Sequence, residues 1–201
     1  SRPTIRAALT GNPGIMNKLR AAVVGVGYFG SRHVDKWAAL DDVELAYVVD
    51  RDGDLARKIA RKHGALPATD CAEIAGKVDV ASVAVPTQHH FGVASALLDA
   101  GIHVLVEKPV TETVEQAREL IALAASSGRV LQVGHLERFN AVILAAESQL
   151  RNPRFLECHR VAPFRERGTD VNVVLDLMIH DLDVVLAFEG ERSHQYRILR
   201  A

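Results

Sequence analysis

The chain has 201 residues, of which 48% are hydrophobic and 24% charged, and its formal net charge at pH 7 is −1. This near-neutral balance, without a run of five or six like charges, argues against a nucleic-acid-binding surface. No apolar stretch approaches the roughly 20 residues of a membrane helix, so no membrane partner is expected. The two cysteines, Cys71 and Cys158, match no metal-ligand spacing, and we interpret both as free thiols in the reducing cytoplasm.

From residue 19 the chain alternates short β-branched runs with amphipathic stretches. The predicted strands are 20–27, 43–50, 78–86, 101–107 and 129–135, and the predicted helices are 29–40, 53–64, 90–101 and 113–128. Nearly all-apolar strands that alternate with helices indicate a parallel sheet covered on both faces. We therefore predict an α/β fold with a doubly wound Rossmann domain over 19–135, preceded by a disordered leader over 1–18.

The regular alternation of predicted strands and helices ends after residue 135. A crossover helix is predicted over 137–151, a strand over 154–164 and a long amphipathic helix over 171–188. These elements indicate a second, α+β domain over 136–201. One strand and one helix do not make a sheet layer, and the tail from Glu189 has little periodicity. We therefore expect this domain to be incomplete, truncated at its C-terminal sheet.

The motif "GVGYFG" places Gly25, Gly27 and Gly30 in G-x-G-x-x-G spacing after a strand and before a helix. Glycines permit a tight turn and close approach of a pyrophosphate, which the helix N-terminus favours. Asp50 ends the next strand and would accept hydrogen bonds from the adenosine ribose, which favours NAD over NADP; the neighbouring Arg51 weakens that preference, since it could face a phosphate. The alternative is a glycine-rich turn without a ligand. The predicted cofactor contacts here are Gly25, Gly27, Tyr28, Phe29, Gly30, Asp50 and Arg51.

Two further segments end strands on the ligand-binding side of such a sheet. In "AVPTQHHF" (84–91), Pro86 and Thr87 would shape the loop at the nicotinamide side and His90 would begin the next helix, although a surface cap is the simpler reading of a single histidine. In "VLVEKPVTE" (104–112), a buried strand delivers Glu107 and Lys108 just before a proline. A lysine at this point could hydrogen-bond a substrate hydroxyl, whereas an exposed loop lysine is the common alternative. The further predicted cofactor contacts are Pro86, Thr87, His90, Glu107 and Lys108.

The segment "VLDLMIHDLD" places Asp176, His180 and Asp183 at i, i+4 and i+7, which is one face of an α-helix. Histidine is the usual general base near neutral pH, so this stripe indicates a catalytic site. A structural Asp176–His180 pair is the alternative. A metal site would need a third ligand, which the sequence does not supply, so no metal is predicted.

Taken in order, "GVGYFG", "VEKPV" and "DLMIHDLD" resemble the Gfo/Idh/MocA oxidoreductase family over about residues 19–188. The resemblance implies a Rossmann domain that binds NAD(P), and a site that oxidises a sugar or cyclitol hydroxyl. It implies catalytic roles for Lys108 from "EKP" and for Asp176 and His180 from "DLMIH". His180 would take the hydroxyl proton, Lys108 would polarise the oxygen, and hydride would pass to the nicotinamide.

Within that family, "GHLERFN" (134–140) and "TDVNVVLDLMIHDLD" (169–183) are similar to bacterial UDP-N-acetylglucosamine 3-dehydrogenases, which act in lipid A precursor synthesis. This similarity implies a sugar-nucleotide substrate, placement of Glu137 near it, and substrate contacts from Arg138, Asn140, Asp176 and His180. Full-length relatives are expected to be homo-oligomers. The alternatives are a myo-inositol or other free-sugar dehydrogenase, and an inactive NAD-binding fragment.

Overall fold

The computed structural model describes residues 18–147, 149, 155–160 and 172–189. The chain divides into two compact units, unit 1 (residues 1–134) and unit 2 (residues 135–201), and each is considered by itself. The predicted leader, apart from Lys18, and the tail 190–201 lie outside the described residues, as do the outer parts of the predicted strand 154–164.

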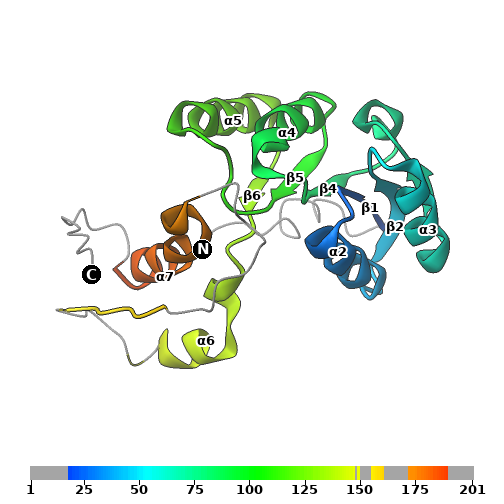
Figure 1. Cartoon of the computed structure of the whole chain (residues 1–201). Helices are drawn as coiled ribbons and strands as arrows, with labels where there is room; N and C mark the ends of the chain where they lie inside the picture. Colours follow the sequence, from blue (N-terminus) through cyan, green and yellow to red (C-terminus); the bar gives the residue numbers. More distant parts are fainter. Residues whose placement is uncertain (1–17, 148, 150–154, 161–171, 190–201) are drawn as a thin grey trace, which may run out of the picture. The chain divides into compact units, whose positions relative to one another are not determined.

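In the described part of unit 1, six parallel strands form one sheet in the order β3-β2-β1-β4-β5-β6 (Figure 1). The strands are β1 (Leu19–Val24), β2 (Val43–Val49), β3 (Leu66–Ala68), β4 (Val80–Val83), β5 (His103–Val106) and β6 (Leu131–Val133). The order reverses between β1 and β4, which is the switch point of a doubly wound sheet. The predicted Rossmann fold is confirmed.

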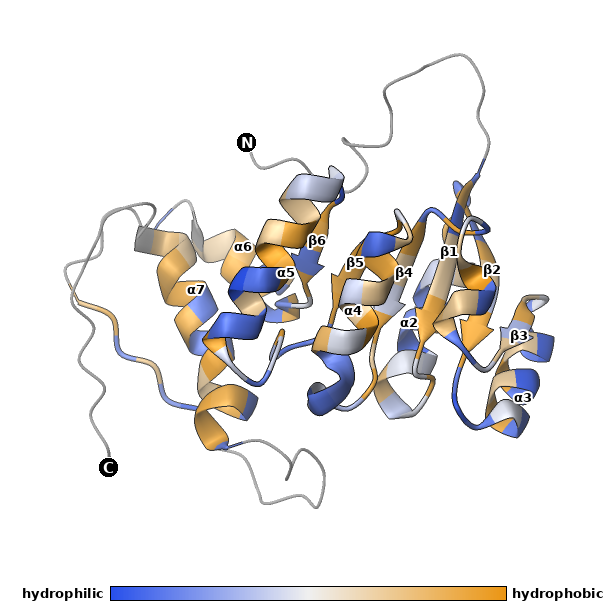
Figure 2. Ribbon diagram, turned by 90° about the horizontal axis from the view of Figure 1, so that it is seen from above, coloured by the Kyte–Doolittle hydropathy of each residue, from blue (hydrophilic) through white to orange (hydrophobic). Residues whose placement is uncertain are grey.

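Helices cover both faces of this sheet. They are α2 (Tyr28–Ala38), α3 (Gly53–His63), α4 (His90–Asp99) and α5 (Val114–Ser127), with single 3₁₀ turns η1 (Cys71–Ile74) and η2 (Thr87–His89). Buried side chains of α2 and α3 pack on one face and those of α4 and α5 on the other. Figure 2 shows the strands as mainly hydrophobic, while the helices also carry hydrophilic stretches. The strands therefore lie between two apolar layers, as their continuous apolar sequence indicates.

The alternation of side chains along β1 illustrates how both faces are filled. Ala22 and Val24 belong to the apolar cluster under α4 and α5, whereas Val23 belongs to the cluster under α2 and α3. All three are at most 4% exposed. Because successive strand residues point to opposite faces, a parallel strand buried on both sides needs an apolar residue at nearly every position.

The helix ends follow local capping rules. The Asp52 carboxylate accepts hydrogen bonds from the backbone N–H groups of Asp54 and Leu55 at the start of α3. The helix ends at Gly64, which has φ +70°, the left-handed conformation that glycine adopts without steric cost. The predicted stop of this helix at Gly64 is confirmed.

Strand β3 was not predicted. It has three residues, includes Pro67, and pairs with Tyr47–Val49 of β2 at the sheet edge. Three residues are too few for a recognisable alternation, and proline is tolerated on an edge strand because one side needs no donor.

Unit 2 differs from the prediction in two places. The predicted helix 137–151 is broken at Asn140, where a 3₁₀ turn η3 (Leu136–Phe139) gives way to α6 (Ala141–Glu147). Residues 155–160 form no strand, because no neighbouring strand in the described residues supplies a hydrogen-bonded ladder; Arg160 instead donates to the Asp181 carboxylate at 2.8 and 3.0 Å. The predicted long helix is present, as a π-helical turn η4 (Val174–Met178) followed by α7 (Ile179–Glu189).

A buried histidine gives unit 1 a predicted pH dependence. The Val130 N–H donates to Nδ1 of His103, at 2.9 Å, and burial, followed by the charge of Arg129, lowers the pKa of this imidazole below its ordinary 6.5. The contribution of His103 to stability is therefore fully present above about pH 6.5 and is lost as the pH falls through the lowered pKa. His103→Asn keeps an acceptor at the Nδ1 position but does not titrate, so its melting temperature should fall less than that of the unmodified chain between pH 8 and pH 5. Equal falls in the two proteins would contradict this assignment.

Candidate functional site

Close backbone contacts shape the glycine-rich turn between β1 and α2. Gly25 has φ +81°, and a Cβ there would lie 2.7 Å from Val85 Cγ1. A Cβ on Gly30 would overlap the carbonyl oxygen of Gly25, whereas a Cβ on Gly27 would have no described neighbour within 4 Å. The turn therefore needs glycine at positions 25 and 30 for its own geometry, and it leaves open space at Gly27 where a ligand can approach the backbone.

The N-terminus of α2 is suited to an anion. Gly27 is the N-cap, no side chain caps the helix, and its first turn contains no acidic residue. The first N–H groups of a helix lack partners inside the helix and carry partial positive charge. Tyr28 and Phe29 begin the helix with exposed rings 5.3 Å apart in an edge-on arrangement, and the Arg32 guanidinium lies 5.1 Å from the Tyr28 ring centre.

Asp50, the predicted ribose ligand, directly follows β2 and also holds the glycine turn. Its Oδ2 accepts from the Val26 N–H at 2.8 Å, and its Oδ1 accepts from the Asp52 N–H at 2.9 Å. Each carboxylate oxygen has two acceptor positions, so these bonds leave capacity for a ribose hydroxyl. The neighbouring Arg51 is exposed.

The segment after β4 is tied to the segment after β5 by His90. Thr87 is buried after Pro86, and His90 begins α4, as predicted. His90 is only 1% exposed, so the interpretation of this histidine as a surface cap is wrong. The two ring nitrogens lie 2.8 Å from the carbonyl oxygens of Val85 and Pro109. In this arrangement His90 shapes both loops through their backbones, and a direct contact with a cofactor stays a prediction.

Glu107 and Lys108 lie at the carboxyl end of β5, two strands from β1 across the switch point. The Glu107 N–H donates to the carbonyl oxygen of Val83 at 3.0 Å, so the β4–β5 pairing continues one residue past the strand. Lys108 follows immediately, and the Lys108–Pro109 peptide bond is cis. The predicted lysine is thus placed on the ligand-binding edge of the sheet.

In unit 2, Asp176 lies in the π-helical turn η4 and His180 in the first turn of α7, both half-buried. The N–H of Ile179 bonds to the carbonyl of Val174, an i to i+5 pattern. The predicted stripe of Asp176, His180 and Asp183 assumed a regular α-helix, and the wider turn changes that spacing. The catalytic role of this segment stays a prediction.

The predicted substrate contacts Arg138 and Asn140 have local partners within unit 2. The Arg138 guanidinium donates to both carboxylate oxygens of Asp183, with 2.9 Å from Nε to Oδ2, and Asp183 is 8% exposed. Asn140 Oδ1 accepts from the Val142 N–H at 3.0 Å, and its amide lies 3.5 Å from Glu137. Lys108 belongs to unit 1 and these residues, with Asp176 and His180, to unit 2. Their meeting in one site stays a prediction.

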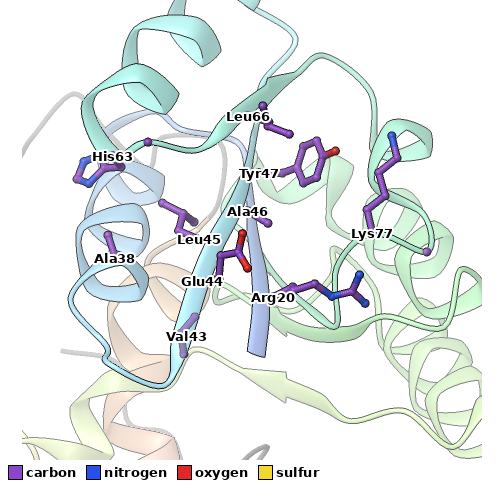
Figure 3. Close-up of a pocket in the computed structure, with 12 residues that line it drawn as sticks. Arg20, Ala38, Val43, Glu44, Leu45, Ala46, Tyr47, His63, Leu66 and Lys77 are labelled. Carbon is purple, nitrogen blue, oxygen red and sulfur yellow. The ribbon is translucent and has the colours of Figure 1, made fainter. Parts of the chain in front are cut away.

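A hollow of about 510 Å³ lies beside the first half of β2 (Figure 3). It is lined by Arg20, Ala38, Val43, Glu44, Leu45, Ala46, Tyr47, His63, Gly64, Leu66, Gly76 and Lys77. Arg20 and Val43 lie at the beginnings of β1 and β2, so the hollow is at the opposite end of these strands from the glycine turn. Arg20 is paired with Asp79 at 2.7 Å, and this pair lowers the pKa of the Asp79 carboxyl. We assign no function to this hollow.

Comparison with known families decides the class of the protein. The sequence model of the GFO_IDH_MocA family, an oxidoreductase family with an NAD-binding Rossmann fold, matches residues 19–135. The chain belongs to the Gfo/Idh/MocA oxidoreductase family.

Relatives within the Gfo/Idh/MocA family match both units. A UDP-N-acetylglucosamine 3-dehydrogenase of Acidithiobacillus ferrooxidans is 39% identical over 178 residues, which cover 87% of this chain and 56% of that protein. Its solved structure has a TM-score of 0.79 at 36% identity and covers 86% of this chain and 56% of that one. GenD2 from gentamicin A biosynthesis, solved in complex with NAD, has a TM-score of 0.76 at 27% identity, with coverage of 91% and 57%.

A third Gfo/Idh/MocA relative has a different named substrate. An inositol 2-dehydrogenase/D-chiro-inositol 3-dehydrogenase of Shouchella clausii is 29% identical over 193 residues, 90% of this chain and 56% of that protein. The chain thus spans about half the length of the curated relatives it matches.

The Rossmann fold of this family binds NAD, and the glycine turn of the chain fits that cofactor. The open space at Gly27 and the uncapped N-terminus of α2 can receive a pyrophosphate, while Asp50 lies at the end of the next strand. Within the described ranges, no group of three or more His, Cys, Asp or Glu side chains could hold a metal ion. None of the described helices is long and apolar enough to cross a membrane.

Two residues at this edge of the sheet were missed by the sequence analysis. His33 lies on α2 with Nε2 2.8 Å from Glu107 Oε1, and Gly134 lies after β6 against the same carboxylate. The local signals were that His33 follows Gly30 by three residues, nearly one helical turn, and that Gly134 begins the segment "GHLERFN". Their proximity to Glu107 arises only in the folded sheet.

Proposed function

We propose that this protein is an NAD-dependent dehydrogenase that oxidises a secondary hydroxyl of a sugar nucleotide, at C3 of UDP-N-acetylglucosamine. The observation that carries the proposal is how much of the chain matches the Acidithiobacillus ferrooxidans enzyme. It covers 87% of the chain, which is more than the 134 residues of unit 1, so similarity extends into the unit of Asp176 and His180. The cofactor domain alone would not distinguish substrates, because a fold hosts many functions.

The proposed roles follow from the chemistry of the bound cofactor and of five side chains. Bound NAD supplies the hydride acceptor. His180 accepts the proton of the substrate hydroxyl, because imidazole is an effective base near neutral pH. Lys108 donates a hydrogen bond to the hydroxyl oxygen and stabilises negative charge that develops on it. Asp176 orients His180, and Arg138 and Asn140 contact the sugar nucleotide.

The 3-oxo product would be a substrate for amination in lipid A precursor synthesis, as the sequence resemblance implies. Cys71 and Cys158 are both free thiols, which supports a cytoplasmic location. Full-length relatives would be homo-oligomers.

Activity measurements with a panel of alcohols test the proposed identity of the substrate. NADH formation is measured by absorbance with UDP-N-acetylglucosamine, UDP-glucose, free glucose and myo-inositol. We expect UDP-N-acetylglucosamine to give the highest kcat/KM. The match to the inositol dehydrogenase over 90% of the chain makes a cyclitol the second candidate, which a preference for myo-inositol would establish. NAD binding without turnover of any substrate would indicate a non-catalytic NAD-binding fragment.

Cofactor preference gives a separate prediction. NAD should bind more tightly than NADP, because the Asp50 carboxylate would repel the additional 2′-phosphate. Asp50→Asn removes the charge and keeps an acceptor for the Val26 N–H, so the preference should narrow without loss of the turn. Dissociation constants for both cofactors, measured by calorimetry, check this. Equal affinity of the unmodified chain for NAD and NADP would refute the role of Asp50.

A further inference from the structure

The carboxylate of Glu107 is the meeting point of three segments that are far apart in sequence. Its Oε1 lies 2.8 Å from Nε2 of His33 on α2. The same carboxylate lies against Gly134, which follows β6, so that a Cβ on Gly134 would be 3.0 Å from Oε1 and 3.3 Å from Oε2. The backbone of Glu107 is itself bonded to Val83 at the end of β4. One side chain therefore joins α2 to the ends of β5 and β6.

The pair is shielded from water. The side chain of His33 is 13% exposed and that of Glu107 is 14% exposed. A carboxylate at this depth is costly without a hydrogen-bond donor, and the histidine ring supplies one. Gly134 does not have positive φ, and a side chain there would make the Glu107 carboxylate shift by a few tenths of an ångström.

The position of the pair gives it a relation to the dinucleotide. In the sheet, β4 lies between β1 and β5, and α2 follows β1. A bond from α2 to the residue after β5 therefore passes across the carboxyl end of β4, beside the switch point where ligands of such sheets bind. Gly30, whose contact with Gly25 closes the glycine turn, precedes His33 by three residues on α2, and Lys108 directly follows Glu107.

We propose that His33 is a positioning residue that acts through Glu107. The His33–Glu107 hydrogen bond fastens the helix that receives the pyrophosphate to the strand end that carries Lys108. The two halves of the cofactor site then form one rigid surface, with the nicotinamide end supported by the Glu107–Lys108 backbone. This role rests on the proposed use of NAD, and it assigns Glu107 to holding the site together in addition to any contact with the cofactor.

The test compares NAD with ADP, which lacks the nicotinamide half. His33→Leu should weaken NAD binding roughly tenfold, which corresponds to about 1.4 kcal/mol, and leave ADP binding nearly unchanged. His33→Gln, whose amide nitrogen can replace Nε2 as a donor, should restore NAD affinity. Gly134→Ala should reproduce the loss by displacing the carboxylate while both partners stay in the chain.

A matched control is available on the same unit. His63 also pairs with a carboxylate, Asp35, at 3.3 Å, and its side chain is 14% exposed, but it lines the hollow at the other end of the strands. His63→Leu should leave the NAD-to-ADP affinity ratio unchanged.

The outcomes separate this proposal from the proposed function. Equal loss of NAD and ADP affinity in His33→Leu and Gly134→Ala, or no rescue by His33→Gln, would overturn the positioning role while NAD binding by the unmodified chain stands. If His33→Leu does not fold, the ratio of NAD affinity to ADP affinity in Gly134→Ala and His33→Gln tests the positioning role instead. Failure of the unmodified chain to bind NAD would overturn the proposed function and the positioning role together.

Discussion

Replacement of Lys108 by alanine is expected to lower kcat by about 100-fold or more, the effect typical of a lost acid–base group, while NAD affinity changes little. Lys108 lies after the end of β5 on the ligand-binding edge of the sheet. An ammonium group there stabilises the substrate oxygen only as its proton leaves, so its loss should affect the chemical step more than binding.

Turnover is best measured in a chimera in which the chain is continued by the C-terminal part of the Acidithiobacillus ferrooxidans relative, since the chain spans 56% of that protein. Lys77→Ala is the matched control, because Lys77 lies in the hollow beside β2, 5.7 Å from the Tyr47 ring centre. NAD affinity is measured in parallel on the unmodified 201-residue chain and its variants. A normal kcat in Lys108→Ala would show that Lys108 has no catalytic role and is only a charged residue at a strand end.

Alanine should mainly affect stability at Gly30 and mainly affect cofactor binding at Gly27. In Gly30→Ala, the new Cβ would overlap the Gly25 carbonyl oxygen, so the turn must move; we expect a loss of about 1–3 kcal/mol in the free energy of unfolding, or more, as in other overpacked sites. In Gly27→Ala, the Cβ meets no described atom within 4 Å, and stability should change by less than about 1 kcal/mol.

The same Gly27→Ala substitution should lower NAD affinity by roughly tenfold or more, because the methyl group occupies the space through which the pyrophosphate approaches the backbone. Gly92→Ala is the control: Gly92 is an exposed residue of α4 with the same open surroundings. It should gain about 0.4–1 kcal/mol of stability and bind NAD normally. Melting temperatures with and without NAD report both effects. Unchanged NAD affinity in Gly27→Ala would place the cofactor elsewhere.

The order of strands and helices in unit 1 could be predicted because its signals are local. Largely apolar runs such as 43–50 indicate strands. Asp52 begins helix α3 and Gly64 ends it, each through contacts within a few residues. Strand β3 escaped prediction because its three residues become a strand only by pairing with β2. The strand predicted at 154–164 is not formed over 155–160. Its alternating sequence favours a strand, but alternation alone does not supply a neighbouring strand to pair with.

The candidate site divides in the same way. Sequence reasoning was sufficient for the glycine spacing, Asp50 at a strand end and the Glu107–Lys108 pair, because each depends on its position in one element. The tertiary structure alone decided that Glu107 contacts His33 and lies against Gly134, and that Arg138 pairs with Asp183. These contacts join residues 74, 27 and 45 positions apart. No local pattern encodes such pairs, since which side chains meet depends on strand order and on the packing of helices over the sheet.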